Sequence, residues 1–570
     1  MVSHQELSSL IWTVCDDILR GLFKPTEYGR IILPFVVLRR LDCVLEPHKQ
    51  DMYDLYEKYK EQIDDVSPII RKQTGTTYYN TSKYDLSRLK GDSTNVLMNF
   101  RNYVNGYSPE VREIIENFQL DTLVEKLQKN KRLYQLIDKF TEIDLHPNRI
   151  SNHQMGQVYE ELLRKFSEMT NEESGDHYTP RDIVKLLVNF VFYGNKDDLQ
   201  GEGKIRSVFD PCCGTGGMLS IGKEWINEHI NPNLNLNLFG QELNDITYSI
   251  CKSDFLLGGE DPNNIQLGNS ISNDRFEGRK FEYMITNPPF GVSWKSDKQF
   301  VENEQGDPNG RFFVGTPRTS DGSLLFLQHL IDKMDSRGSR IGIVFNGSPL
   351  FTGDSGSGES EIRKWVIEND WLECIVSLPD QLFFNTGITT YFWIVSNKKK
   401  PERRGKVQLI DGTSFYTQMK KSLGSKRKYI TDTHRQKLFD IYESFEDGEY
   451  SRIYPNEFFG YTKIRIEQPQ LDENGTPITK KDGTPKPDTS KRDYERVPLT
   501  DDIEEYFERE VKPHLPDSWI DWDNNKVGYE INFTKYFYKY QPLRSVEEIT
   551  QELMKLEEES KDLMNHILED

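Results

Sequence analysis

Four consecutive residues, Asn287-Pro288-Pro289-Phe290, have the types and the order that methylation of an exocyclic amine requires. The lone pair of such an amine is delocalised into its heteroaromatic ring, so the nitrogen is a poor nucleophile. Two acceptors that bind its two hydrogens can draw the nitrogen towards tetrahedral geometry and aim the lone pair at a methyl donor. The side-chain carbonyl of Asn287 and the backbone carbonyl of Pro288 can be these acceptors, on a turn that two prolines stiffen.

Phe290 completes this tetrad with an aromatic face on which an extruded base can stack. The apolar run at residues 281–286 predicts a buried strand that would end at the tetrad. A strand that ends in a proline-rich turn without any chemistry is the alternative, and Asn-Pro alone would favour it. The complete tetrad after an apolar strand favours catalysis.

A glycine-rich loop upstream has the features of a site for the methyl donor. Residues 205–209 predict a short buried strand, Asp210 follows it, and Gly214-Thr215-Gly216-Gly217 lead into a helical pattern. Such a loop lets the backbone approach a ligand and aims helix N–H groups at it. A second strand pattern, residues 234–242, ends at Glu242, where a carboxylate can accept both ribose hydroxyls. The pattern suits any nucleoside cofactor, and S-adenosylmethionine is favoured because the amine-binding tetrad lies two strands later.

A phosphate-binding P-loop is the alternative for part of this region, because residues 217–223 have its spacing. However, Glu224 stands where a P-loop needs Ser or Thr to ligate magnesium. The segment is also expected within the helix rather than in the loop before it. The sequence therefore argues against a P-loop.

Taken together, these motifs resemble the methyltransferase (M) subunit of type I DNA restriction–modification systems, a gamma-type N6-adenine methyltransferase. The resemblance runs from the N-terminal helices to the last helix and rests on several stretches in combination. They are residues 175–181 (GDHYTPR), 210–217 (DPCCGTGG), 287–291 (NPPFG), 320–326 (SDGSLLF), 345–351 (FNGSPLF) and 385–391 (NTGITTY). The fold it implies is α/β: a doubly wound, Rossmann-like S-adenosylmethionine-dependent methyltransferase domain with a helical N-terminal domain and a C-terminal helical extension.

The resemblance also implies which residues bind the cofactor. Residues 176–181 would cradle its methionine end, Asp210 and the glycine loop would face its amino-acid group, Glu242 would bind the ribose, and Asn269 would lie near the adenine. By residue, the set is Asp176, His177, Tyr178, Thr179, Pro180, Arg181, Asp210, Gly214, Thr215, Gly216, Gly217, Glu242 and Asn269. Asp254 is the alternative for the adenine contact, although it is expected within a helix. Local structure alone would explain residues 177–183 as the entry to a helix.

The formal net charge of −20 over 570 residues is an unexpected balance for a DNA enzyme, because attraction to phosphate dominates nucleic-acid affinity. Either the substrate is not DNA, or another subunit carries much of the binding. The resemblance favours the second explanation, because a specificity (S) subunit reads the sequence in that family. It further implies double-stranded DNA, a second copy of this M subunit joined through S, and a restriction (R) subunit as partners. Locally basic segments, 398–400 and 403–404, could contact phosphate or be solvated surface charge.

Six cysteines without metal-ligand spacing predict a reduced, cytoplasmic protein with no bound metal. Cys212 and Cys213 are then expected to act as small residues of the cofactor loop. The N-terminus has no signal-peptide character. The longest apolar run, residues 31–38, is too short to cross a bilayer.

Three regions are predicted along the chain. Residues 1–150 form a helical domain for assembly and for clamping DNA, with a strongly buried helix over residues 31–45. Residues 151–415 alternate between strand and helix patterns and contain all the motifs, which predicts the doubly wound sheet. Residues 416–570 form a C-terminal region that docks the specificity subunit. The small-residue run 353–358 is either a mobile loop near the site or a plain linker.

Two features characterise the C-terminal region. Residues 463–466 and 494–497 are expected to pair as strands around a polar insertion, whose turn signals at 474–477 and 482–485 predict an extruded hairpin. The last helix has an a/d heptad pattern that can pack on its own domain or on a partner helix. Its positions are Val546, Ile549, Leu553, Leu556, Ser560, Leu563 and Ile567.

The sequence thus favours an N6-adenine DNA methyltransferase subunit that acts with a specificity subunit. A methyltransferase acting on protein glutamine or on RNA is an alternative, because Asn-Pro-Pro-aromatic also serves those substrates. Thr179-Pro180, the long helical N-terminal region and residues 321–323 argue against it. A non-catalytic assembly scaffold that keeps the fold is the other alternative, and intact Asn287, Phe290 and Glu242 argue against that one.

Overall fold

The structure is a computed structural model, and its described part divides into two compact units, residues up to Ile531 and residues from Asn532 onwards. The described residues are 11–150, 154–155, 158–159, 162, 165–166, 179–192, 196–384, 386–423, 425–538 and 545–569. Within these ranges, no helix combines the length and the apolar character needed to span a membrane.

The N-terminal region is helical, as predicted. Its longest helix, α2 (Tyr28–Leu45), contains the predicted buried helix, and every residue of its apolar run 31–38 is buried. A helix that is apolar on all sides requires cover on all sides, and the surrounding helices supply it. They are α3 (Lys49–Tyr59), α4 (Ser67–Thr74), α5 (Leu86–Leu89), α6 (Val96–Asn105), α7 (Pro109–Asn117), α8 (Leu120–Lys129) and α9 (Leu133–Thr141).

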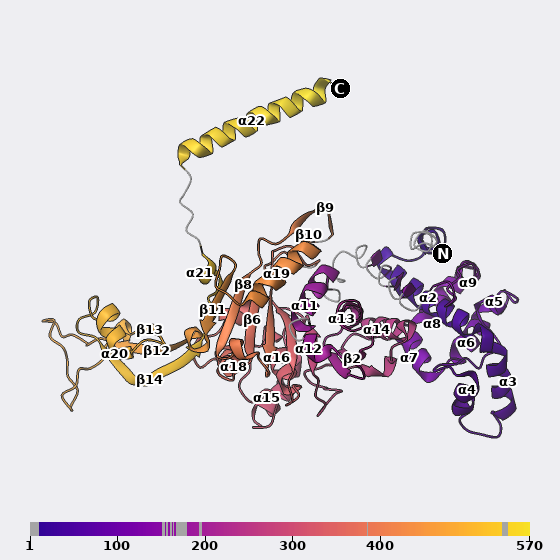
Figure 1. The fold of residues 1–570 in the computed structure, drawn as a ribbon, viewed down its shortest axis with the longest axis horizontal. Helices are drawn as coiled ribbons and strands as arrows, with labels where there is room; N and C mark the ends of the chain where they lie inside the picture. The colour runs from indigo at the N-terminus through magenta and orange to yellow at the C-terminus, as the bar shows by residue number, and fades with distance from the viewer. Residues whose placement is uncertain are drawn as a thin grey trace. The chain divides into compact units, whose positions relative to one another are not determined.

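A nine-stranded sheet forms the centre of the first unit (Figure 1). Its order is β11-β8-β6-β7-β5-β4-β1-β2-β3. Strand β7 runs antiparallel to β5 and β6, β11 runs antiparallel to β8, and the other neighbours are parallel. The strands are β1 (Ile205–Asp210), β2 (Asn235–Glu242), β3 (Ile265–Leu267), β4 (Tyr283–Thr286), β5 (Arg340–Phe345), β6 (Leu372–Ser377), β7 (Tyr391–Ser396), β8 (Lys406–Asp411) and β11 (Ser451–Pro455). Strand β11 lies beyond residue 415; the predicted boundaries at residues 150 and 415 stay predictions.

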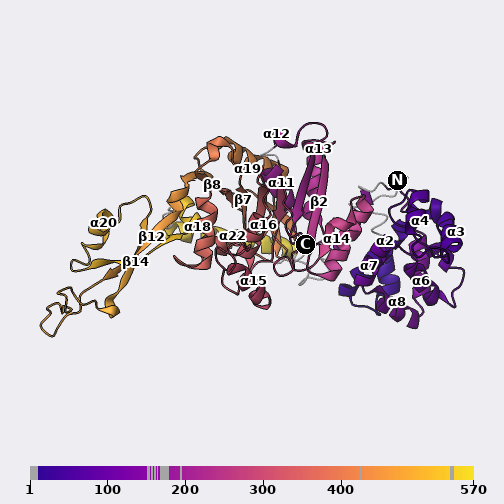
Figure 2. The same ribbon diagram turned by 90° about the horizontal axis from the view of Figure 1, so that it is seen from below.

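Helices cover both faces of this sheet, which confirms the doubly wound α/β fold (Figure 1, Figure 2). One face carries α11 (Arg181–Phe192), α13 (Gly217–His229) and α19 (Asp432–Ser444), which share one apolar core with the strands. The other carries α16 (Ser323–Asp332), which contacts β5 and α18 (Gly358–Glu368). Short helices α12 (Lys196–Leu199), α15 (Lys298–Gln305) and α17 (Ser348–Phe351) connect these elements.

Helix α14 (Asp245–Gly258) belongs to two hydrophobic cores at once. Its residues Ile250, Leu256 and Leu257 are buried in the core of the N-terminal helices. Its residues Tyr248, Cys251 and Phe255 are buried in the core of the sheet. The carboxylate of Glu113, on α7, accepts hydrogen bonds from Tyr248 Oη at 2.8 Å and from Lys252 Nζ at 2.7 Å. The helix therefore joins the N-terminal region to the nine-stranded sheet.

Two of the basic residues considered for phosphate binding are buried instead. Lys399 is 5% exposed and donates to Asp370 at 2.6 Å, and Arg403 is 3% exposed and donates to Gln408 at 2.9 Å. Because both side chains satisfy acceptors in the interior, the expectation that they contact phosphate or solvent is wrong for them.

The strands predicted around the polar insertion do pair. β12 (Gly460–Glu467) lies between β13 (Asp493–Pro498) and β14 (Trp519–Tyr529) in a separate three-stranded sheet. The insertion folds back twice, at Gly475 (φ 79°) and Gly483 (φ 83°), with bridges between Leu471 and Pro477 and between Thr479 and Pro485. The predicted extruded hairpin is confirmed.

The loop at residues 353–358 is not a plain linker, because it makes long-range contacts; its mobility stays a prediction. Asp354 accepts a hydrogen bond from Tyr461 Oη at 3.2 Å and pairs with Lys463 on β12. The buried guanidinium of Arg363 donates to the carbonyls of Thr352 at 2.7 Å and of Tyr529 at 2.7 Å. The loop is thus part of the contact between the nine-stranded sheet and the three-stranded sheet.

The second unit contains α21 (Phe533–Phe537) and the predicted C-terminal helix, α22 (Val546–Glu569). Leu553 and Leu556 of the heptad are 61% and 56% exposed. Their role in docking a partner stays a prediction.

Candidate functional site

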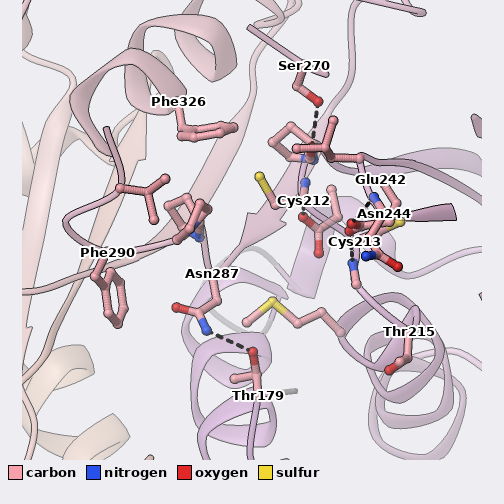
Figure 3. A pocket seen from close by; sticks show the side chains of 18 of the residues that line it. Thr179, Cys212, Cys213, Thr215, Glu242, Asn244, Ser270, Asn287, Phe290 and Phe326 are labelled. Atoms are coloured by element: carbon pink, nitrogen blue, oxygen red, sulfur yellow. Dashed lines mark hydrogen bonds between the residues drawn. The ribbon is translucent and has the colours of Figure 1, made fainter. Parts of the chain in front are cut away.

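The carboxyl ends of β1, β2, β4 and β5 meet at one cavity of about 830 Å³ (Figure 3). Asp210 ends β1 and Glu242 ends β2, while Asn287 and Asn346 directly follow β4 and β5. Strand β1 pairs with β2 on one side and with β4 on the other, so the chain connections diverge at β1. In open α/β sheets this is where ligands bind.

Backbone geometry of the glycine loop explains why glycines stand at the cavity wall. Gly214 and Gly216 have φ angles of 54° and 84°, and a Cβ on Gly216 would lie 2.7 Å from Cys251 Sγ. The second position therefore requires glycine for both conformation and space. Helix α13 begins directly after it, at Gly217. Cys213 lies in the same turn with its Sγ 4.0 Å from Cys251 Sγ, so it packs as a small residue, as predicted.

Asp210 is a buried carboxylate on the cavity wall. It is 1% exposed and accepts the Cys212 backbone N–H at 2.9 Å. Burial raises the pKa of Asp210 to about 7, and the nearby charge of Glu242 adds to that rise, while the Cys212 hydrogen bond opposes it. Among the described residues no cation pairs with Asp210, so a cationic ligand group would fit beside it.

Glu242 is also buried on this wall, with each carboxylate oxygen accepting one backbone N–H. Oε2 accepts from Gly214 at 2.9 Å and Oε1 accepts from Asn244 at 2.8 Å. Each oxygen of a carboxylate has a second lone pair, so both can still accept hydroxyl groups. This arrangement also ties the glycine loop to β2.

Asn269 lines the cavity, but its side chain is hydrogen-bonded within the protein. Its Nδ2 donates to Asp297 at 3.0 Å and its Oδ1 accepts the Ile271 N–H at 2.9 Å. Neighbouring Ser270 donates to the Pro211 carbonyl at 2.6 Å, which holds this loop beside β1. The alternative, Asp254, lies in α14 as expected, accepts from Ser220 at 2.9 Å and is not among the lining residues.

The tetrad places an oriented acceptor in the cavity. Asn287 Nδ2 donates to Thr179 Oγ1 at 3.0 Å, which fixes the amide plane (Figure 3). Its Oδ1 is buried and has no hydrogen-bond partner among the described residues. Buried polar atoms are nearly always hydrogen-bonded, so this oxygen is an acceptor left unmet by the described residues.

Pro288, Pro289 and Phe290 line the cavity beside Asn287. The Phe290 ring makes an edge contact with Phe383, with ring centroids 6.3 Å apart and an interplanar angle of 79°. This contact supports the Phe290 ring from one side.

The run predicted to cradle the cofactor's methionine end is only partly within the described residues, because Asp176, His177 and Tyr178 lie outside them. Thr179 lines the cavity. Pro180 and Arg181 do not: the Pro180 carbonyl accepts the Ile183 N–H at 3.0 Å, and Arg181 pairs with Glu224 on α13 at 3.6 Å. The helix entry predicted from local sequence is confirmed for its described residues, since α11 begins at Arg181.

Of the other residues predicted for the cofactor, Gly214, Thr215 and Gly217 line the cavity. Gly216 is not a lining residue; it is the N-cap of α13. Residues 217–223 lie within α13, which confirms the argument against a P-loop.

Sequence reasoning assigned no role to several other lining residues. Asn346, Ile388, Val292 and Phe383 converge on the cavity from separate loops. Asn346 and Ile388 fall in the stretches 345–351 and 385–391, whose resemblance to the family was the available signal. The sequence gives no such signal for Phe383, because its contact with Phe290 depends on the fold.

The chain is similar to known protein families and to individual relatives. Residues 150–458 match the N-6 DNA methylase family, and residues 7–140 match the HsdM N-terminal domain. The type I restriction enzyme MjaIX methylase subunit of Methanocaldococcus jannaschii is 27% identical over 482 residues, which cover 79% of this chain and 80% of that protein. The HindI methylase subunit of Haemophilus influenzae is 30% identical over 258 residues, or 45% of this chain and 54% of that protein.

Solved structures share the fold. The methyltransferase subunit of a type I restriction-modification system from Streptococcus thermophilus superposes with a TM-score of 0.63 at 20% identity, covering 80% of this chain and 97% of that one. A chain from an assembly of the type I R-M system has a TM-score of 0.56 at 19% identity, covering 99% of this chain and 98% of that one. The chain belongs to the N-6 DNA methylase family, and its resemblance to type I restriction–modification methyltransferase subunits is confirmed.

Proposed function

We propose that this chain methylates the N6 amino group of adenine in double-stranded DNA, as the M subunit of a type I restriction–modification system. The main support is Asn287 Oδ1, a buried acceptor that Thr179 orients and that has no partner among the described residues. An unmet buried acceptor costs about 1–3 kcal/mol, and an exocyclic amine entering the cavity would supply the missing donor.

S-adenosylmethionine is the proposed methyl donor, and it would supply an electrophilic methyl group on a sulfonium. The donor set fits it: Asp210 lacks a cation among the described residues and Glu242 keeps free lone pairs. Asp210 would hold the ammonium group, Glu242 the ribose hydroxyls, and the backbone of residues 214–217 the amino-acid end. Asn269 would face the adenine, while residues 176–178 would complete the methionine pocket.

The protein's own contribution to the reaction is orientation. Asn287 Oδ1 and the Pro288 carbonyl would accept the two amine hydrogens and direct the nitrogen lone pair at the methyl group. As the nitrogen gains positive charge its hydrogens become more acidic, so both hydrogen bonds strengthen towards the transition state. No covalent bond to the protein and no strong general base are needed.

Partners are also part of this proposal. A separate S subunit would read the DNA sequence and receive α22, a second copy of this chain would bind the same S subunit, and an R subunit would join them. Protein glutamine or RNA as substrate is the rival, and membership of a family described as DNA methylases favours DNA.

The test is transfer of a tritiated methyl group to DNA by this chain with and without its S subunit, followed by nucleoside analysis. We expect N6-methyladenine, formed efficiently only with S present. Label on RNA or protein with none on DNA would contradict the substrate, and no transfer to any of them would support a scaffold.

Phe290 variants test base extrusion. Because stacking of an aromatic ring on a base contributes roughly 1–3 kcal/mol, Phe290→Ala should lower kcat/KM by about 5- to 150-fold, while Phe290→Tyr and Phe290→Trp should keep most of the activity. Steady-state kinetics with a fixed duplex measures this. Equal activity of the Ala and Trp variants would show that Phe290 only packs against Phe383.

Asp210 predicts a pH dependence of cofactor affinity. Its pKa is raised to about 7 mainly by burial, so below pH 7 a bound cation requires release of a proton. The affinity for S-adenosylmethionine should therefore fall about tenfold per pH unit from pH 7 down to about pH 5. Calorimetry measures the profile, and Asp210→Asn is the control, expected to bind weakly at pH 7 with a flat profile. A flat wild-type profile would contradict this role.

A further inference from the structure

A hairpin beside the catalytic cavity is positively charged, whereas the chain as a whole is negatively charged. Residues 412–431 contain Lys420, Lys421, Lys426, Arg427 and Lys428 and no acidic residue, in a chain of net charge −20. They form β9 (Thr417–Leu423) and β10 (Lys426–Tyr429), an antiparallel hairpin separate from the main sheet (Figure 1).

Backbone hydrogen bonds attach the hairpin to the loop behind Phe290. The N–H groups of Ser425 and Arg427 donate to the carbonyls of Phe384 and Gln381, both at 2.9 Å. Phe383 lies between Gln381 and Phe384 in the sequence. It lines the cavity and contacts Phe290. The position of the hairpin is therefore coupled to that of the ring proposed to stack on the base.

A second attachment joins the hairpin to the helix behind Asn287. Lys426 is 5% exposed, and its Nζ donates to the Leu382 carbonyl at 2.9 Å and to Asp182 at 3.1 Å. The Ile430 N–H donates to the same Asp182 carboxylate at 2.8 Å. Asp182 lies in the first turn of α11, three residues after the Thr179 that orients Asn287. Lys426 therefore has a structural role, because it attaches the hairpin beside the catalytic cavity.

Three other cations of the hairpin have no such partner. Lys420, Lys421 and Arg427 are exposed, and their side chains make no ion pair or hydrogen bond with the described residues. By contrast, Lys428 pairs with Asp380 at 2.5 Å and lies 4.0 Å from the centroid of the Tyr416 ring. Exposed ammonium and guanidinium groups without counter-ions favour a polyanion.

We propose that the β9–β10 hairpin binds the phosphate backbone of the DNA beside the extruded base, through Lys420, Lys421 and Arg427. This inference rests on the proposed function, because it needs DNA at the cavity. Contacts of this kind position a duplex without reading its sequence. They would let an acidic chain hold DNA against its cavity while another subunit reads the target.

The test uses the full complex with the S subunit and the triple variant Lys420→Gln, Lys421→Gln, Arg427→Gln. Each lost phosphate contact lowers the slope of log K against log salt by about 0.9, so the slope should fall by about 2.7. Wild-type complex should then lose about 40-fold more affinity than the variant between about 50 and 200 mM salt. The KM for DNA should rise, while kcat at saturating DNA and cofactor affinity should not change.

The matched control is Lys480→Gln, Lys481→Gln, Lys486→Gln, which makes the same charge change on the exposed insertion. It should keep the wild-type slope. An equal fall in the control would assign the effect to net charge and overturn the proposal, as would an unchanged slope in the hairpin variant. Failure of the hairpin variant to assemble with S would show that the hairpin is a protein interface, and this would also overturn the proposal. Methylation of DNA by the wild-type complex tests the proposed function separately. If it occurs, the proposed function stands whatever the variants show; if it does not occur, the proposed function itself is refuted.

Discussion

Replacing Asn287 with alanine is expected to lower kcat by a factor of about 10²–10³, or about 2.7–4 kcal/mol of transition-state stabilisation. The substitution removes the buried, unpartnered Oδ1 that would accept an amine hydrogen. Because no cofactor group is assigned to this side chain, affinity for S-adenosylmethionine should stay within a few-fold of wild type. Single-turnover methyl transfer and calorimetry measure the two quantities separately.

Thr179→Val is the companion variant, since valine keeps the shape of threonine and removes the acceptor for Asn287 Nδ2. It leaves Oδ1 in place but no longer fixes its direction, so we expect a smaller loss of kcat, up to about tenfold. Parallel loss of catalysis and cofactor affinity in Asn287→Ala would instead mean that the residue supports the fold of the cavity.

The double variant Leu553→Asp, Leu556→Asp should abolish co-purification with the S subunit. Both side chains are more than half exposed in this chain, so burying them in a partner seam would place unpaired charges in an apolar contact. Specific DNA binding should fall with assembly, by a factor of about 10³ or more, to the non-specific level of this acidic chain. Pull-down and a binding isotherm on the target duplex report both effects.

Lys555→Asp is the matched control, because it changes the net charge by the same amount on the same helix but lies off the heptad stripe. It should keep the partner. Retained S binding by the double variant would refute docking through α22. A lowered melting temperature of the isolated double variant would show that the stripe packs on this chain itself.

The sequence predicted best those elements whose signals are local. Apolar runs followed by chemistry-bearing residues located β1, β2 and β4, and their parallel order then brought Asp210, Glu242 and Asn287 to one edge. The heptad likewise predicted α22 as a helix.

Contacts between distant segments could not be predicted in this way. Asp354 and Lys463 pair across more than a hundred residues, so the loop at 353–358 looked like a free connection. The ammonium of Lys399 resembled surface charge because its acceptor, Asp370, lies on a different element. The site shows the same limit: the support of Phe290 by Phe383 and the attachment of the basic hairpin through Asp182 exist only once the chain is folded.

Helix α14 has a consequence for how this protein can be divided. Its two sides are buried in two different cores, and it begins three residues after the Glu242 proposed to bind ribose. A chain cut at residue 150 would expose Ile250, Leu256 and Leu257 as an apolar stripe on α14. The helical region and the catalytic region match separate families, yet they are not interchangeable modules: any exchange of one between relatives must carry a complementary α14 with it.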